Sequence, residues 1–207
     1  KTDTEAATRD LADAILMQIG MAPIDLAFVF FSAHHAAKVS MISAMLQGEL
    51  QAKACIGCSG EGVIAGSEEI ETAAALTIWV ARLPHVRLTP LQLSVSQLQD
   101  QIRMPGWPEP GLEDSTFLLL ADPFTTPTQE VLSLLTDRYP HGKAVGGLAG
   151  GGQDAGENRL LLNDQVFDGG LVGIQLTGPI AVRPVISQGC RPIGERFVVT
   201  RSEENLI

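Results

Sequence analysis

Two glycine-rich segments hold most of the residues that could bind a ligand. They are residues 57–62 and 146–152, with the candidate binding residues Gly57, Cys58, Ser59, Glu61, Gly62, Gly146 and Gly147. Backbone N–H groups in successive glycines can form a concave anion site, which suits a single carboxylate. Neither segment has the Gly-x-Gly-x-x-Gly or Gly-Lys-Ser/Thr pattern of a phosphate loop. Because glycine tolerates positive φ, tight turns without a ligand are the alternative.

Polar side chains beside predicted strands could complete this site. Asp122 follows the apolar run 115–121, and open α/β sheets bind ligands at the carboxyl ends of their strands. Gln188, Cys190 and Arg191 follow a second apolar stretch. The planar guanidinium of an arginine matches the geometry of a carboxylate.

We expect these groups to converge on a small molecule, with an amino acid as the leading class. Backbone amides and Arg191 would face a carboxylate, while Glu61 or Asp122 would pair with an ammonium group. An amino acid carries both charges about one Cα apart. The expected site therefore lies in a cleft between the two halves of the chain.

An enzymatic alternative uses some of the same residues. Ser59, Asp122 and His141 follow the chain order of an α/β-hydrolase triad, and residues 57–61 nearly match the Gly-x-Ser-x-Gly nucleophile elbow. The fifth position is a glutamate where the elbow needs a small residue, and a β-like stretch follows where a helix is required. Cys58 is a second candidate nucleophile. We expect a ligand-binding protein without catalytic activity. The alternatives are a hydrolase that uses Ser59 or Cys58 as its nucleophile, and a protein-interaction scaffold that binds no ligand.

The cysteines and histidines predict neither a redox pair nor a metal site. Cys55 and Cys58 lie three apart at the end of a predicted strand, where that spacing is about 10 Å and beyond disulfide reach. Zinc would need two further ligands, and no second paired motif occurs. His34 and His35 are adjacent and face apart on a helix, which favours a helix surface. No cofactor is expected.

The hydrophobic pattern predicts two β-α-β units. The first has a strand at 25–32, a helix at 36–51 and a strand at 53–57. The second has a strand at 115–121, a helix at 128–139 and a strand at 143–147. An offset of 89 residues, from Gly57 to Gly146, aligns the apolar positions and glycine segments of both units without a gap. This alignment predicts a structural duplication.

Antiparallel strands are predicted after each unit, so the fold class is α/β. The duplicated β-α-β units are each followed by antiparallel strands, and the mixed sheets have flanking helices. The two units are expected to share a sheet. The predicted antiparallel strands are 71–80, 86–93, 159–162, 170–176 and 180–186. The domain prediction is an N-terminal helix at 1–22, a first unit at 23–103, a linker at 104–114, a second unit at 115–188 and the start of a truncated partner domain at 189–207.

Composition limits the classes of partner. The 207 residues contain 14 Lys and Arg against 24 Asp and Glu, for a formal charge of −10. Because nucleic-acid binding needs a basic face, no nucleic-acid partner is expected. No apolar run reaches the roughly 18–20 residues of a membrane span, so no membrane is expected. The three cysteines are too few and odd in number for a disulfide framework, and no leader sequence is visible at the start of the chain. Both observations predict a cytoplasmic location.

Several motifs, taken in order, resemble the FIST family (F-box and intracellular signal transduction), specifically its N-terminal domain. They are Phe30-Phe-Ser32, residues 57–62, residues 118–124, residues 146–150 and, as the most specific, residues 185–194 continuing to 198–200. The resemblance implies a non-catalytic sensory domain that binds small ligands such as amino acids. It also implies a C-terminal FIST domain as a partner, while the signalling output stays unknown.

Overall fold

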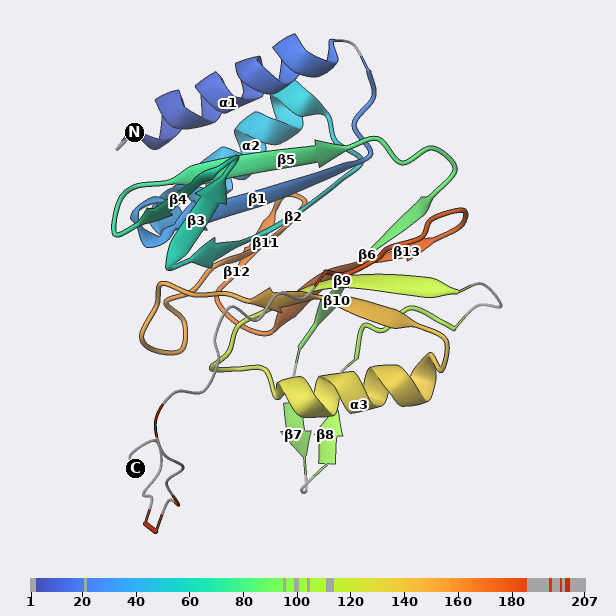
Figure 1. The fold of residues 1–207 in the computed structure, drawn as a ribbon. Coiled ribbons are helices and arrows are strands. Elements are labelled where there is room, and N and C mark those ends of the chain that lie inside the picture. The colour runs from blue at the N-terminus through green and yellow to red at the C-terminus, as the bar shows by residue number, and fades with distance from the viewer. Residues whose placement is uncertain are drawn as a thin grey trace.

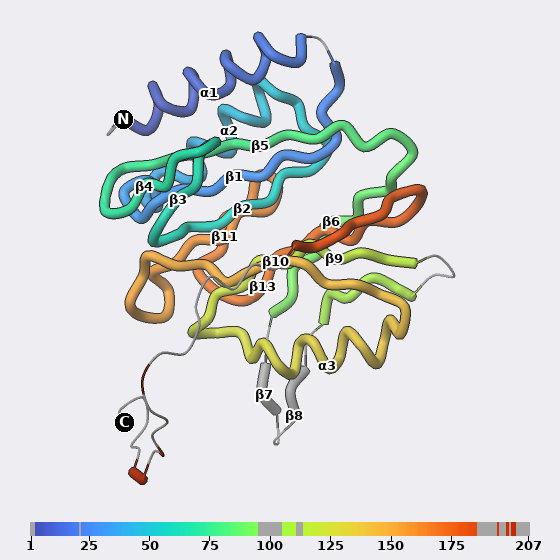
Figure 2. The backbone as a smooth tube through the Cα atoms, viewed as in Figure 1, coloured from blue at the N-terminus to red at the C-terminus, as the bar shows by residue number. Residues whose placement is uncertain are grey.

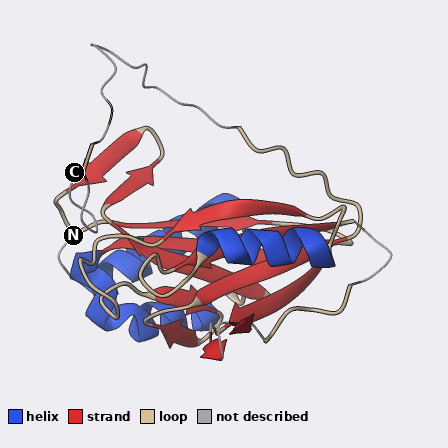
Figure 3. Ribbon diagram, turned by 90° about the horizontal axis from the view of Figure 1, so that it is seen from below, coloured by secondary structure: helices blue, strands red, loops and turns tan. Residues whose placement is uncertain are grey.

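Two mixed sheets pack face to face at the centre of the structure, and helices cover their outer faces (Figure 1). The computed structural model describes residues 3–20, 22–94, 96–98, 101–103, 105–110, 114–185, 194, 198, 200 and 201. The helical segments in this part are α1 (Thr4–Ile19), η1 (Ala33–Lys38, a 3-10 helix), α2 (Val39–Leu50) and α3 (Thr128–Arg138). Seen from below, α3 lies in front of the strands of the lower sheet and runs along them (Figure 3).

The first sheet has five strands in the order β12-β11-β2-β1-β5. They are β1 (Leu26–Ser32), β2 (Ala54–Gly60), β5 (Leu76–Ala81), β11 (Leu160–Leu162) and β12 (Gln165–Phe167). β1 and β2 are parallel and joined through α2, whereas β5 and β11 pair antiparallel to them. This sheet forms the upper layer under α1 and α2 (Figure 1).

The second sheet has four strands in the order β10-β9-β13-β6. They are β6 (Arg87–Leu93), β9 (Ser115–Ala121), β10 (Lys143–Leu148) and β13 (Leu171–Thr177). β9 and β10 are parallel and joined through α3, and β13 is antiparallel to both β9 and β6. Two small hairpins complete the described strands: β3 (Gly62–Ala65) with β4 (Glu68–Glu71), and β7 (Ser96–Leu98) with β8 (Gln101–Arg103).

The side-chain alternation of the continuous apolar strands explains these layers. In β1, Ala27, Val29 and Phe31 pack against α1 and α2, whereas Phe28 and Phe30 face the second sheet. In β9 the same alternation divides the residues between the α3 face and the first sheet. Because successive side chains of a strand point to opposite faces, a strand covered on both sides is apolar at every position.

Each sheet contains strands from both halves of the chain. β6 follows the first β-α-β unit but pairs with β13, and β11 follows the second unit but pairs with β2. Figure 2 shows β6 running beside β13, on the right of the view at mid-height. The two units therefore exchange strands.

The α/β class with mixed sheets and flanking helices is confirmed, with corrections in detail. The two units share sheets by exchanging antiparallel strands, while each parallel pair lies in its own sheet. Residues 57–60 belong to β2 and not to a loop, and residues 180–185 form no strand. In each parallel pair an antiparallel strand lies beside the first strand: β5 beside β1, and β13 beside β9. The duplication and the domain boundaries stay predictions.

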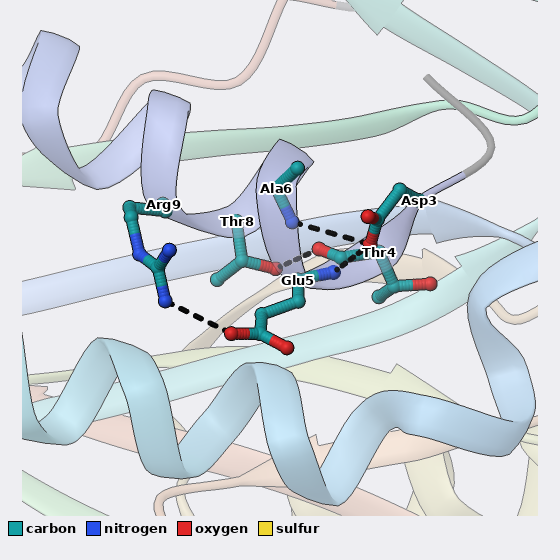
Figure 4. Close-up of polar contacts among 6 residues, drawn as sticks. All are labelled: Asp3, Thr4, Glu5, Ala6, Thr8 and Arg9. Atoms are coloured by element: carbon teal, nitrogen blue, oxygen red, sulfur yellow. Dashed lines mark hydrogen bonds and ion pairs between the residues drawn. The ribbon is translucent and has the colours of Figure 1, made fainter.

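Helix α1 begins at a side-chain cap, shown in Figure 4. The Asp3 carboxylate accepts hydrogen bonds from the backbone N–H groups of Glu5 at 3.0 Å and Ala6 at 3.3 Å. These bonds satisfy donors that have no partner within the helix. Thr8 donates its hydroxyl to the Thr4 carbonyl at 2.7 Å, and the Thr4 hydroxyl lies within hydrogen-bond distance of His35 Nδ1, so both buried threonine hydroxyls have a partner.

His35 corrects the expectation of a surface histidine pair. Its side chain is buried, and its Nδ1 lies 2.9 Å from the Thr4 hydroxyl oxygen, whereas His34 is exposed. Burial lowers the pKa of His35, which favours the neutral imidazole. The histidine therefore joins η1 to the first turn of α1.

No helix among the described residues has the length and apolar character needed to cross a membrane.

Asp25 joins three segments at the start of β1. Its carboxylate lies 2.6 Å from the Lys53 ammonium and accepts the Leu83 N–H at 2.6 Å. The Lys53 ammonium, and then the Leu83 N–H, lower the pKa of this buried carboxyl. A lowered folded-state pKa stabilises the fold above the ordinary pKa, and this stability is lost as pH falls through the folded value.

We expect Asp25→Asn to lower the free energy of unfolding at pH 7 by about 1 kcal/mol, because a charged acceptor is replaced by a neutral one. The difference from the parent should shrink as pH falls below about 4. Urea unfolding between pH 3 and pH 7 measures both effects, with the exposed Asp13→Asn as the control. An equal loss at both ends of that range would contradict the assignment.

Candidate functional site

A cavity of about 560 Å³ lies between the two sheets. Its walls come from the inner faces of β1, β2, β9 and β10 and from β3. The lining residues are Phe28, Phe30, Ile56, Cys58, Ser59, Gly60, Gly62, Val63, Ile64, Leu118, Leu119, Leu120, Val145, Gly146, Gly147 and Leu148. A smaller cavity of about 250 Å³ lies on the opposite face of β10, beside α3.

The two glycine-rich segments meet beside the larger cavity. The Gly150 N–H donates to the Ser59 carbonyl at 3.0 Å. A Cβ placed on Gly151 would lie 3.1 Å from the Gly60 carbonyl oxygen, so the two backbones are nearly in contact. The convergence predicted from the repeat is therefore present in the structure.

Gly57 and Gly146 are required by close strand packing. Gly57 pairs with Val29 in the β1–β2 ladder, and a Cβ on Gly57 would overlap the Val29 carbonyl oxygen. Gly146 pairs with Leu119 in the β9–β10 ladder, where a Cβ would overlap the Leu119 carbonyl oxygen. These two glycines thus shape parallel strand pairs, and both lie in strands, as the predicted strands at 53–57 and 143–147 have them.

A buried polar network links the carboxyl ends of both sheets. Asn158 is 1% exposed and donates its amide to Asp122 Oδ1 at 2.9 Å, while its own oxygen accepts the Gly152 N–H at 3.0 Å. The Thr125 hydroxyl donates to the other oxygen of Asp122 at 2.7 Å. The Ser59 hydroxyl lies 3.5 Å from the Asn158 oxygen and accepts the backbone N–H that follows Asn158.

The predicted site residues divide into four groups. Cys58, Ser59, Gly62, Gly146 and Gly147 line the cavity between the sheets. Glu61 is exposed and stands between two lining glycines, and Gly57 lies within β2. Asp122 is fully buried and bonded within the protein. Gln188, Cys190 and Arg191 lie outside the described residues.

The local geometry does not fit the hydrolase alternative. A nucleophile elbow turns from strand to helix, but β2 runs past Ser59 to Gly60 and is followed by β3. The described partners of the Ser59 hydroxyl are Asn158 and the Arg159 backbone, and His141 lies in an exposed turn after α3. Burial raises the pKa of both Cys55 and Cys58 to about 12, so neither thiol ionises readily.

Asn158 is the residue that sequence reasoning missed. It precedes the short apolar strand β11, and its only sequence signal is a polar residue next to an apolar run. Its importance comes from contacts with residues 36 and 99 positions away in the chain. Such long-range pairings have no local pattern.

Comparison with known proteins identifies a family for most of the chain. The FIST N domain profile matches residues 25–207. An uncharacterized protein of Mycobacterium tuberculosis strain H37Rv is 32% identical over 182 residues, covering 88% of this chain and 47% of that protein. An uncharacterized protein of Mycobacterium bovis is 33% identical over 175 residues, covering 84% of this chain and 44% of that protein.

The chain spans about half the length of the curated relatives it matches. No solved structure matches the chain.

We expect Asn158→Asp to destabilise the fold strongly at pH 7, by about 2–4 kcal/mol, because it places a second carboxylate beside the buried Asp122 and removes its amide donor. Like charges at this distance raise the pKa of one carboxyl, so stability should partly recover as pH falls toward 5. Chemical denaturation at both pH values measures this recovery. The control is Asn163→Asp, which keeps the oxygen that accepts the Cys55 N–H at 3.0 Å; a similar loss there would argue against the network.

Proposed function

Because the chain belongs to the FIST family, matching its N domain from residue 25 to residue 207, we propose that it is a sensory input domain whose cavity between the two sheets binds a small ligand. The observation that carries this proposal is the cavity itself. Its volume of about 560 Å³ falls within the range of about 300–1,000 Å³ that ligand sites occupy.

The position of the cavity suits a sensor. Its walls come from both sheets, so a ligand inside it would contact β1 and β2 on one side and β9 and β10 on the other. Each sheet contains strands from both halves of the chain, and binding would therefore constrain the whole domain. A ligand can only shift a conformational equilibrium through such differential contacts.

The charged side chains that would pair with an amino acid are only partly available at this cavity. Asp122 is occupied by Asn158 and Thr125, and Glu61 is exposed at the edge of the cavity. Arg191 lies outside the described residues. An amino acid is therefore one of the ligand classes to test, beside small carboxylates and neutral aromatic compounds.

A thermal-denaturation panel of these three classes tests the proposal. A ligand at 100 times its Kd should add about 2.7 kcal/mol to stability and raise the melting temperature accordingly. Cys58→Leu extends a side chain into the cavity and should abolish most of that shift. Thr128→Leu enlarges a residue of the smaller cavity beside α3 and should leave the shift intact.

If no compound in the panel raises the melting temperature, this result would contradict ligand sensing. The ligand-free interaction scaffold would then explain the structure better. The feature supporting it is β10, an exposed edge strand with no strand on its outer side among the described residues.

A further inference from the structure

The described lining of the cavity between the sheets carries no charged side chain. Its side-chain polar group is the Ser59 hydroxyl, which already accepts the Arg159 N–H at 3.1 Å and faces the Asn158 oxygen. Transferring an ion into an apolar environment without a partner is strongly unfavourable. The lining therefore favours an uncharged ligand over a zwitterion or an anion.

Aromatic rings form one wall of the same cavity. Phe28 and Phe30 lie two residues apart on β1, with ring centroids 6.2 Å apart and ring planes within 15° of each other. Both are only half-buried although β1 is an interior strand, because the cavity leaves their inner faces uncovered. Trp79 on β5 lies against Phe28, with centroids 5.5 Å apart, and is 58% exposed. Aromatic faces in a common orientation suit a flat ring.

The opposite wall supplies backbone polar groups. Residues 145–148 of β10 line the cavity, and within the described part of the chain β10 is an edge strand of its sheet. An edge strand presents unpaired N–H and C=O groups along its outer side. Gly147 has nothing within 4 Å of where a Cβ would stand, so one face of the strand is open at this residue. A neutral ligand could pair its own polar edge with these groups.

We propose that the cavity between the sheets takes an uncharged, flat aromatic molecule that carries one neutral hydrogen-bonding group, such as an amide. This inference rests on the proposed function, since it names the ligand class of the same site. The ring lies against Phe28 and Phe30, and the amide lies toward the backbone of β10. The charged ends of an amino acid have no counterpart in this arrangement.

Isothermal titration calorimetry with four matched probes tests the inference on the unmodified chain. The probes are 2-naphthamide, its anion 2-naphthoate, the zwitterion 3-(2-naphthyl)-L-alanine and the saturated decahydronaphthalene-2-carboxamide. We expect 2-naphthamide to bind at least ten-fold more tightly than each of the others. Tighter binding of the anion or zwitterion, or equal binding of the saturated amide, would overturn the proposal.

Two substitutions of the same kind then locate the aromatic contact. Phe30→Leu keeps an apolar side chain but removes a ring from the cavity wall, so the preference for 2-naphthamide over the saturated amide should collapse to about two-fold. Phe124→Leu makes the same change at a half-exposed residue outside the cavity and should leave the preference unchanged. Should Phe30→Leu fail to fold, the four probes on the unmodified chain still decide the matter.

The outcomes separate this inference from the proposed function. If the naphthyl probes do not bind but amino acids or carboxylates raise the melting temperature, the aromatic class is wrong and sensing stands. If neither the probes nor the panel bind, both proposals fail. If 2-naphthamide binds and Phe124→Leu weakens it as much as Phe30→Leu does, the cavity is the wrong location.

Discussion

Both sheets of this domain are apolar on both faces, and this constraint determines the four-layer arrangement. A sheet that exposed either face would leave a large apolar surface in water, which is unfavourable in proportion to its area. Helices α1 and α2 cover one outer face and α3 covers the other, so the remaining two faces can only cover each other. The packing is incomplete where β10 carries two glycines, and the large cavity lies at that place. The same constraint therefore creates the core and its unfilled region.

Strand exchange makes the two β-α-β units one cooperative body. β6 contributes to the second sheet and β11 to the first, so neither sheet can be completed by one half of the chain. The buried network around Asn158 adds a polar connection at the carboxyl ends, where it satisfies Asp122 without any ionic partner among the described residues. Buried polar groups that are fully bonded fix a unique arrangement, and for this reason the meeting point of the glycine segments is well defined.

Membership of the FIST family places the domain among proteins whose curated relatives are about twice as long as the matched region. The ligand proposed for the cavity between the sheets would meet a lining without charged side chains among the described residues. Ser59 and Cys58, the two candidate nucleophiles, lie in a strand with a bonded hydroxyl and a thiol of raised pKa. Neither side chain has an imidazole among its described hydrogen-bond partners.

The sequence by itself determined the fold class and the helices and strands of both β-α-β units, with shifts at their ends. Apolar runs such as 25–32 and 115–121 predict strands covered on both faces, and the helical spacing at 128–139 predicts α3, because these signals depend on neighbours in the chain. Gly57 and Gly146 were recognised as candidate binding residues, whereas their role in close strand packing became visible only in the structure. Only the tertiary structure decided that the units form two sheets with exchanged strands, that Asp122 is used by Asn158, and that Phe28 and Phe30 line a cavity. These outcomes depend on which distant faces meet, and the pattern of apolar and polar residues within one segment carries no information about its partner.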